Sequence, residues 1–228
     1  MQGALPQAQL DALGLLSTCT VANAIETFGV RLRNTGFTNA SVRCVFPAFP
    51  PIVGYAATAR IRNSLPPMQG HAYVVRTDWW SELLTIPAPR VVVLEDADPN
   101  PGLGSFVGEV HASILHALGC VAVVTNGAVR DLHAVEPTGF QMFSGNVTVS
   151  HAYAHVFEFG GPVEVGGLKI SPGDILHGDL HGVLVIPPEI ADKVPGAAQK
   201  LIEREQRIIA FCQSPEFSLD RLRELFKA

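Results

Sequence analysis

Two apolar runs separated by an amphipathic stretch restrict the fold of this chain more than any other feature. The runs are 90–94 (Arg-Val-Val-Val-Leu) and 120–125 (Cys-Val-Ala-Val-Val-Thr), and both have the β-branched composition of strands buried on both faces. Between them, apolar residues at 107, 110, 114, 115 and 118 follow helical spacing, and Gly119 can end the helix. A strand–helix–strand unit forms a right-handed parallel crossover, so the sequence predicts an α/β protein.

The two ends of the chain have helical patterns and surround this strand-bearing region. Two short helices are expected within 7–28, and amphipathic helices are expected at 191–211 and from 218 onward. Short strands are expected between 140 and 186. The prediction is a single α/β domain over 1–228, with a core of about 22–190 and a C-terminal helical extension, 191–228.

Composition excludes several classes of protein. The 228 residues carry a net charge of −5 and no run of Lys or Arg, which argues against a nucleic-acid partner. No apolar stretch reaches the roughly 18 residues of a membrane span, and the N-terminus lacks the basic region of a signal peptide. The four cysteines form no Cys-x-x-Cys pair, which favours buried free thiols. We therefore expect a cytoplasmic protein with no membrane partner.

A glycine-containing loop precedes the central helix and is a candidate anion site. A helix that begins near Gly108 directs its free N–H groups and the positive end of its dipole at this loop. Gly104 and Gly108 would let a ligand approach the backbone, and ligands of parallel sheets gather at the carboxyl ends of the strands. A carboxylate is the natural guest, although plain turn geometry also explains such glycines.

Three charged residues follow or flank these strands. Arg130 offers a donor fork that suits a carboxylate, and Asp131 offers the oxygen ligand that Mg²⁺ or Mn²⁺ prefers. A local salt bridge or a helix-capping Asp is the structural alternative for this pair. Glu109 lies in the first turn of the helix, where it could equally be a dipole partner. Together the three residues predict a functional cleft at one edge of the sheet.

At these residues the chain resembles the RraA-like family, which includes the 4-hydroxy-4-methyl-2-oxoglutarate (HMG) aldolases and the regulator of ribonuclease activity. The matching segment runs from Gly108 to Asp131 and contains the family's pattern of an acidic residue, twenty intervening residues and Arg-Asp. Later segments, 172–175 (Pro-Gly-Asp-Ile) and 178–187, resemble the family's Pro-Gly-Asp and Asp-x-x-Gly-Val-Val-Val-x-Pro motifs. The resemblance extends from about Ala22 to Arg207.

The resemblance implies a swivelling β/β/α fold with helical N- and C-terminal segments, assembled as a homotrimer or a hexamer of two trimers. It implies that Asp131 reaches a divalent metal, Mg or Mn, and that Glu109 holds the metal's water shell. Catalysis would involve Glu109, Arg130 and Asp131. The substrate would be bound by Arg130 and by the segment Gly108, Glu109, Val110 and His111.

Two departures from the family pattern, and one residue expected from a neighbouring subunit, concern the site. The aldolases usually carry Asp at the position of Glu109, and some members carry an acidic residue where this chain has Ala134. In the aldolases a Glu from a neighbouring subunit's C-terminal region enters the site, and Glu203 and Glu205 are the candidates here.

The function that follows is a divalent-metal-dependent lyase acting on a small 2-oxo acid. The reaction would be retro-aldol cleavage of a 4-hydroxy-2-oxo acid such as HMG, decarboxylation of oxaloacetate, or both, through a pyruvate enolate stabilised by the metal and Arg130. No lysine accompanies the motif, which disfavours a Schiff base. The alternative is a non-catalytic protein-binding regulator like the ribonuclease regulator branch.

Other His and Trp residues could suggest a metal or binding site, and structural interpretations are weighed for them. His151 and His155 have a spacing that suits zinc only on a helix, and strand or loop is favoured there. His133, next to the Arg-Asp pair, could line the cleft. Trp79 and Trp80 follow Asp78 in a predicted polar turn and are expected to be core or subunit-contact residues.

Overall fold

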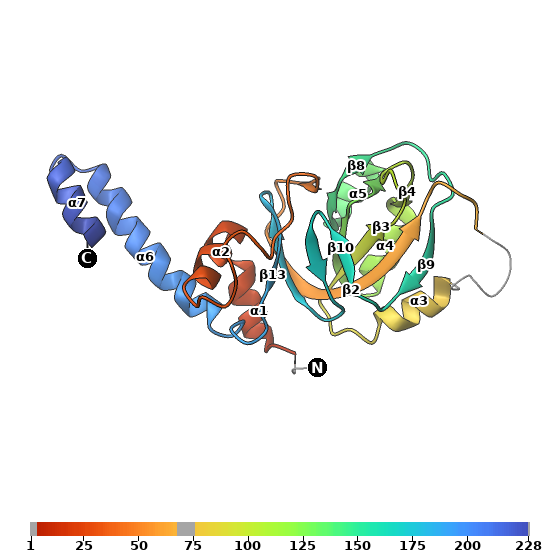
Figure 1. Ribbon diagram of the computed structural model, residues 1–228, viewed down its shortest axis with the longest axis horizontal. Coiled ribbons are helices and arrows are strands. Elements are labelled where there is room, and N and C mark those ends of the chain that lie inside the picture. The colour runs from red at the N-terminus through yellow and green to blue at the C-terminus, as the bar shows by residue number, and fades with distance from the viewer. Residues whose placement is uncertain (1–3, 68–75, 228) are drawn as a thin grey trace.

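A curved eight-stranded sheet forms the centre of the computed structural model, which describes residues 4–67 and 76–227 (Figure 1). The order along the sheet is β1-β7-β5-β3-β2-β12-β13, and β9 also pairs with β2. Strands β7, β5, β3 and β2 are parallel to one another, and the remaining pairings are antiparallel. The bounds are β1 (Arg43–Cys44), β2 (Ile52–Arg62), β3 (Arg90–Asp96), β5 (Cys120–Thr125), β7 (Gln141–Ser144), β9 (His155–Phe159), β12 (Ile175–Asp179) and β13 (Gly182–Ile186).

Strand β3 is buried on both faces, as its composition predicts. Val92 and Leu94 belong to the apolar cluster that includes residues of α4 (Glu109–Ala117), whereas Val91 and Val93 belong to a second cluster. The second cluster contains the inward residues of the hairpin formed by β10 (Val163–Val165) and β11 (Leu168–Ile170). The central sheet therefore has a β-hairpin on one face and helices on the other, which is the layering expected of a β/β/α fold.

Helices from both ends of the chain pack together at the β12–β13 end of the sheet (Figure 1). They are α1 (Gln7–Gly14), α2 (Thr18–Glu26) and α6 (Val194–Cys212); α6 then extends away from the body, and α7 (Leu219–Lys227) lies at its far end. The buried His177 on β12 holds the N-terminal helices: its Nδ1 lies 2.9 Å from Thr18 Oγ1 and its Nε2 lies 3.0 Å from Leu13 O. Asp179 accepts a hydrogen bond from Thr18 N at 2.9 Å.

A second, three-stranded parallel sheet lies beyond the carboxyl ends of the main strands. Its members are β4 (Ser105–Val107), β6 (Ala128–Val129) and β8 (Asn146–Val147), in that order. Each of the first two strands leads directly into a helix: β4 into α4, and β6 into the short α5 (Leu132–Val135), which continues as a 3₁₀ turn, Glu136–Thr138. This small sheet therefore determines how the starts of α4 and α5 lie relative to each other.

Some sequence expectations are corrected here. Trp79 does not lie in a turn; it lies on α3 (Arg76–Leu83) and is 1% exposed in the core, where its ring meets Phe106 edge-on. The four cysteines are free, but only Cys120 is buried, and burial raises the pKa of its thiol to about 12. No helix within 4–67 and 76–227 is long and apolar enough to cross a membrane. The predicted division of 1–228 into a core and an extension stays a prediction, and residues 1–3, 68–75 and 228 lie outside the described part.

Candidate functional site

The start of α4 and the residues after β6 lie side by side because β4 and β6 pair in parallel. Val107 is the partner of Val129 in the register of this pair, and Arg130 N donates a hydrogen bond to Val107 O at 3.1 Å. Both strands are fully buried, so the contact is fixed inside the molecule. Gly108 and Arg130, the residues that follow the two strands, consequently emerge next to each other, as the sequence analysis expects.

Gly108 is the N-cap of α4, and its lack of a side chain makes room for the two residues opposite. A Cβ atom at this position would overlap the carboxylate of Asp131 and would lie 2.9 Å from Arg130 Cγ. Helix α4 begins at Glu109, one or two residues later than the helical pattern suggests, because Val107 belongs to β4. The close approach of two chain segments at Gly108, the start of α4 and residues 130–131, defines the centre of the candidate site.

Asp131 has the only left-handed φ angle, besides Ala152, found at a non-glycine residue in the described chain: φ is 57°. Its carboxylate does not cap α5, the helix that it precedes. Instead Oδ2 accepts a hydrogen bond from Glu109 N at 3.2 Å, at the start of α4, and lies 3.3 Å from Arg130 Nε. A strained backbone conformation that directs a side chain toward a neighbouring segment, as here toward the start of α4, is typical of functional sites.

The remaining predicted site residues differ in their exposure. The side chains of Arg130 and Asp131 are 26% and 36% exposed, and Glu109 is exposed in the first turn of α4. Val110 is 68% exposed. His111 is half-buried and stacks on the ring of Phe106, with 4.6 Å between ring centroids. The structure thus brings together all the predicted residues of this segment, and it leaves their outer face open to solvent.

The donor set fits an open metal site and not a closed cage. Within 4–67 and 76–227 no group of three or more His, Cys, Asp or Glu side chains converges on one point. His151 and His155 do not lie on a helix: His155 is the first residue of β9, and a loop precedes it. A single well-placed carboxylate, that of Asp131, with Glu109 adjacent, is the arrangement that Mg²⁺ uses when water and substrate oxygens complete its coordination. The residues are therefore compatible with Mg²⁺ or Mn²⁺.

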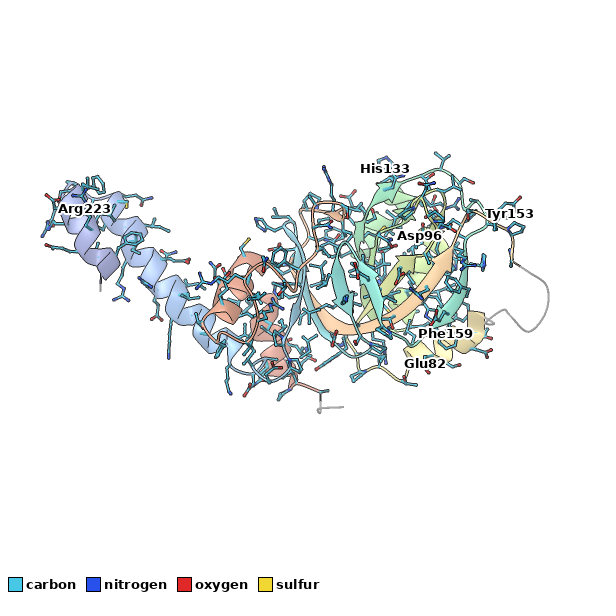
Figure 2. All side chains as sticks on the ribbon, viewed as in Figure 1. Glu82, Asp96, His133, Tyr153, Phe159 and Arg223 are labelled. Atoms are coloured by element: carbon cyan, nitrogen blue, oxygen red, sulfur yellow. The ribbon has the colours of Figure 1, made fainter. Side chains whose placement is uncertain are left out.

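A buried network that the sequence analysis missed holds the loop in front of the site. Asp96, at the end of β3 and 3% exposed, accepts hydrogen bonds from Asn63 Nδ2 and Gly102 N, both at 2.8 Å, and lies inside the body in Figure 2. Burial raises the pKa of Asp96, and these hydrogen bonds oppose the rise in part. Asn126 binds the backbone N–H and C=O of Asp96 at 2.7 and 3.0 Å. In the sequence, the acidic residues Glu95, Asp96 and Asp98 at the end of the apolar run were the signal that could have indicated this network.

Other candidates lie elsewhere. His133 is exposed on α5 at the periphery of the molecule (Figure 2). Glu203 and Glu205 are exposed on α6, which leaves the body on the side away from α4 and α5 (Figure 1). Neither glutamate is therefore brought to the Gly108 site of its own chain.

A large cleft in the molecule does not coincide with this site. Its volume is about 780 Å³, and its lining includes Glu95 and Asn126 but none of Glu109, Arg130 and Asp131. The pairing of β4 with β6 and the contacts of Asp131 define the site at Gly108 independently of this cleft.

Comparison with known proteins gives a consistent result. Residues 18–185 match the protein family described as RraA-like: Aldolase/RraA. A protein of Halalkalibacterium halodurans named "Putative 4-hydroxy-4-methyl-2-oxoglutarate aldolase" is 26% identical over 172 residues, which are 73% of this chain and 81% of that protein.

Two solved structures show the same fold. An uncharacterized protein from Pseudomonas syringae pv. tomato is 22% identical with a TM-score of 0.75, and the match covers 98% of this chain and 96% of that one. Streptomyces coelicolor RraAS2, described as an unusual member of the RNase ES inhibitor RraA protein family, is 19% identical with a TM-score of 0.70 over 90% and 98% of the two chains. The expected fold class is confirmed, and this chain belongs to the RraA-like family.

Proposed function

We propose that this protein is a divalent-metal-dependent lyase that cleaves a C–C bond in a small 2-oxo acid. The observation that carries the proposal is the β4–β6 pairing, which brings the start of α4 against Arg130 and Asp131. The reaction is retro-aldol cleavage of a 4-hydroxy-2-oxo acid such as HMG, decarboxylation of oxaloacetate, or both. The relative at 26% identity, whose name refers to the HMG aldolase activity, supports this class of reaction.

Substrate binding is assigned to Arg130 and to the backbone of 108–111. The first turn of a helix presents N–H groups that have no partner within the helix, and together with the helix dipole they favour a carboxylate. The Glu109 N–H donates to Asp131 Oδ2, so that carboxylate forms part of the pocket wall, and the backbone of Val110 and His111 lines the rest of it. Arg130 adds a charged donor fork on the facing side.

Chemistry in this site requires stabilisation of negative charge on the 2-oxygen as the C–C bond breaks. Arg130 donates hydrogen bonds to that oxygen, and its orientation is held by the carboxylate of Asp131 at 3.3 Å. A divalent cation, when bound by Asp131 with Glu109 supporting its water shell, supplies Lewis-acid stabilisation of the same charge. Glu109, exposed beside the Gly108 site, relays protons to and from water.

The site is open in a single chain, and a homotrimer, or a hexamer of two trimers, would close it. Val110 is 68% exposed and Val147 is 53% exposed on the same small sheet-and-helix unit, as expected of residues that meet a neighbouring subunit. In such an assembly Glu203 or Glu205 on the projecting α6 of one subunit enters the site of the next (Figure 1).

The test is an assay for pyruvate release from oxaloacetate, HMG and related 4-hydroxy-2-oxo acids, with and without Mg²⁺ or Mn²⁺. We expect activity that EDTA abolishes, that added metal restores, and that Asp131→Ala removes. Absence of pyruvate from every acid in the panel, with folded protein and added metal, would refute the lyase and favour a protein-binding regulator.

A further inference from the structure

The cleft of about 780 Å³ lies between the β10–β11 hairpin and the carboxyl ends of the main parallel strands. Three of its lining residues come from those ends: Glu95 on β3, Asn126 directly after β5, and Gly145 directly after β7. Ligands of parallel α/β sheets bind at this edge, and the volume is within the range of small-molecule sites. The cleft is thus a candidate binding site separate from the one at Gly108.

Part of the charge in this cleft is already paired. Arg60 donates to Glu95 Oε1 at 2.9 Å, and Glu95 Oε2 accepts the backbone N–H of Glu164 at 3.0 Å. These contacts join β2, β3 and β10 and fix the floor of the cleft. Arg60 also pairs with Glu158 Oε2 at 3.3 Å, so its guanidinium is already engaged by two carboxylates.

The hairpin wall carries one anion and one cation side by side. Glu164 and Lys169 are direct partners in the register of β10 and β11, and both are exposed. No ion pair within 4.0 Å involves either side chain in the described chain, although they are neighbours. Both charges are therefore available to a molecule that enters the cleft.

The opposite wall offers polar, uncharged groups. Asn39 Oδ1 accepts hydrogen bonds from Ser41 N at 2.9 Å and from Ser41 Oγ at 2.6 Å, which orients the amide. Its Nδ2 lies beside Gly167, where a Cβ atom would be 3.3 Å away. Asn39 thus presents a donor near the turn of the hairpin, and it lines the same cleft as Lys169.

We infer that this cleft binds a small zwitterion of the amino-acid class, with its ammonium group at Glu164 and its carboxylate at Lys169 and Asn39. Arg60 and Glu95 are engaged in ion pairs, so the charges of the lining that remain for a ligand are one anion, Glu164, and one cation, Lys169. The adjacent unpaired charges instead complement a ligand that carries one charge of each sign.

Isothermal titration calorimetry on the full chain, without added metal, tests the inference. The probes are the standard amino acids at up to about 10 mM, together with polyols and dicarboxylates of similar size. We expect at least one amino acid to bind saturably, and its N-acetyl and carboxamide derivatives, which lack one charge each, to bind at least about tenfold more weakly.

Two exposed variants locate the site. Glu164→Gln and Lys169→Gln should each weaken binding by about tenfold or more, and Glu164→Gln should also abolish the preference for the free ammonium over the N-acetyl group. Glu189→Gln and Lys200→Gln, at exposed positions outside the cleft, are the matched controls and should leave the affinity unchanged.

Failure to detect saturable binding of any amino acid would overturn the inference. So would binding of polyols or dicarboxylates in preference to amino acids, or amino-acid binding that both cleft variants leave intact. None of these readouts depends on pyruvate release, so the outcome is distinguishable from failure of the proposed lyase.

Discussion

Replacing Asp131 with Asn separates the chemical role of this residue from its structural role. Asparagine has nearly the same shape, tolerates the left-handed backbone conformation at φ 57°, and keeps an oxygen that can accept the Glu109 N–H. The substitution removes only the negative charge. The Arg130 ion pair and the proposed metal contact are therefore lost together, while the cap on α4 remains.

The expected effects on stability and on activity differ widely in size. Arg130 and Asp131 are 26% and 36% exposed, and partly exposed ion pairs contribute about 0.2–1 kcal/mol. A loss of 1 kcal/mol lowers Tm by about 2–4 °C in a protein of this size. Loss of a charged metal ligand should reduce kcat/KM by at least about 100-fold, or about 2.7 kcal/mol of transition-state stabilisation.

The assay pairs differential scanning fluorimetry with metal-dependent pyruvate release at several Mn²⁺ concentrations. Glu26→Gln is the matched control, because Glu26 forms a comparable ion pair with Arg33 at 3.4 Å far from the site. We expect both variants to have similar Tm values and only Asp131→Asn to lose activity. Should Asp131→Asn retain kcat/KM within about threefold of the unchanged protein, the carboxylate would have only a structural role, and the metal assignment would be refuted.

Three further predictions concern Gly108, Arg130 and His177. Gly108→Ala should lower the free energy of unfolding, measured by urea titration, by about 1–3 kcal/mol and abolish pyruvate release, since its Cβ would displace Arg130 and Asp131. The control is Gly196→Ala on α6, where nothing lies within 4 Å of the added Cβ, and it should be neutral or stabilising in the same titration. Arg130→Lys keeps the charge but loses the fork, so KM for the 2-oxo acid should rise about tenfold or more, and an unchanged KM would exclude a bidentate contact. Burial lowers the pKa of His177 below its ordinary value of 6.5, so the folded state binds fewer protons than the unfolded state. The free energy of unfolding should therefore fall as pH drops below about 6.5. The variant His177→Gln should remove this pH dependence.

The sequence predicts the central elements well because their signals are local and strong. The runs at β3 and β5 and the helix between them have the expected type and nearly the expected bounds. Strand β2 is harder to predict, since Ile52 to Ala56 are buried between β12 and β3 and show no simple alternation. Strand β12 lies within the region 140–186 where short strands are expected, but its buried polar residues, His177 and Asp179, hide its own apolar pattern.

The candidate site was predictable as a group of residues but not as a geometry. Two-residue strands such as β6 carry no periodicity, so the β4–β6 pairing that brings Gly108 to Arg130 cannot be derived from the pattern alone. The same holds for Asp131, whose carboxylate turns away from its own helix to reach Glu109. Such contacts depend on residues more than twenty positions apart, and only the fold brings them together.

The joint between β4 and β6 is made of peptide groups, which any sequence possesses. The distance between the two segments that follow β4 and β6 is therefore set by the backbone and does not depend on their side chains. Exchanging an exposed residue such as Val110 would alter the surface beside Gly108 without disturbing the backbone pairing. Gly108 is not open to such exchange, because any side chain there would displace Arg130 and Asp131.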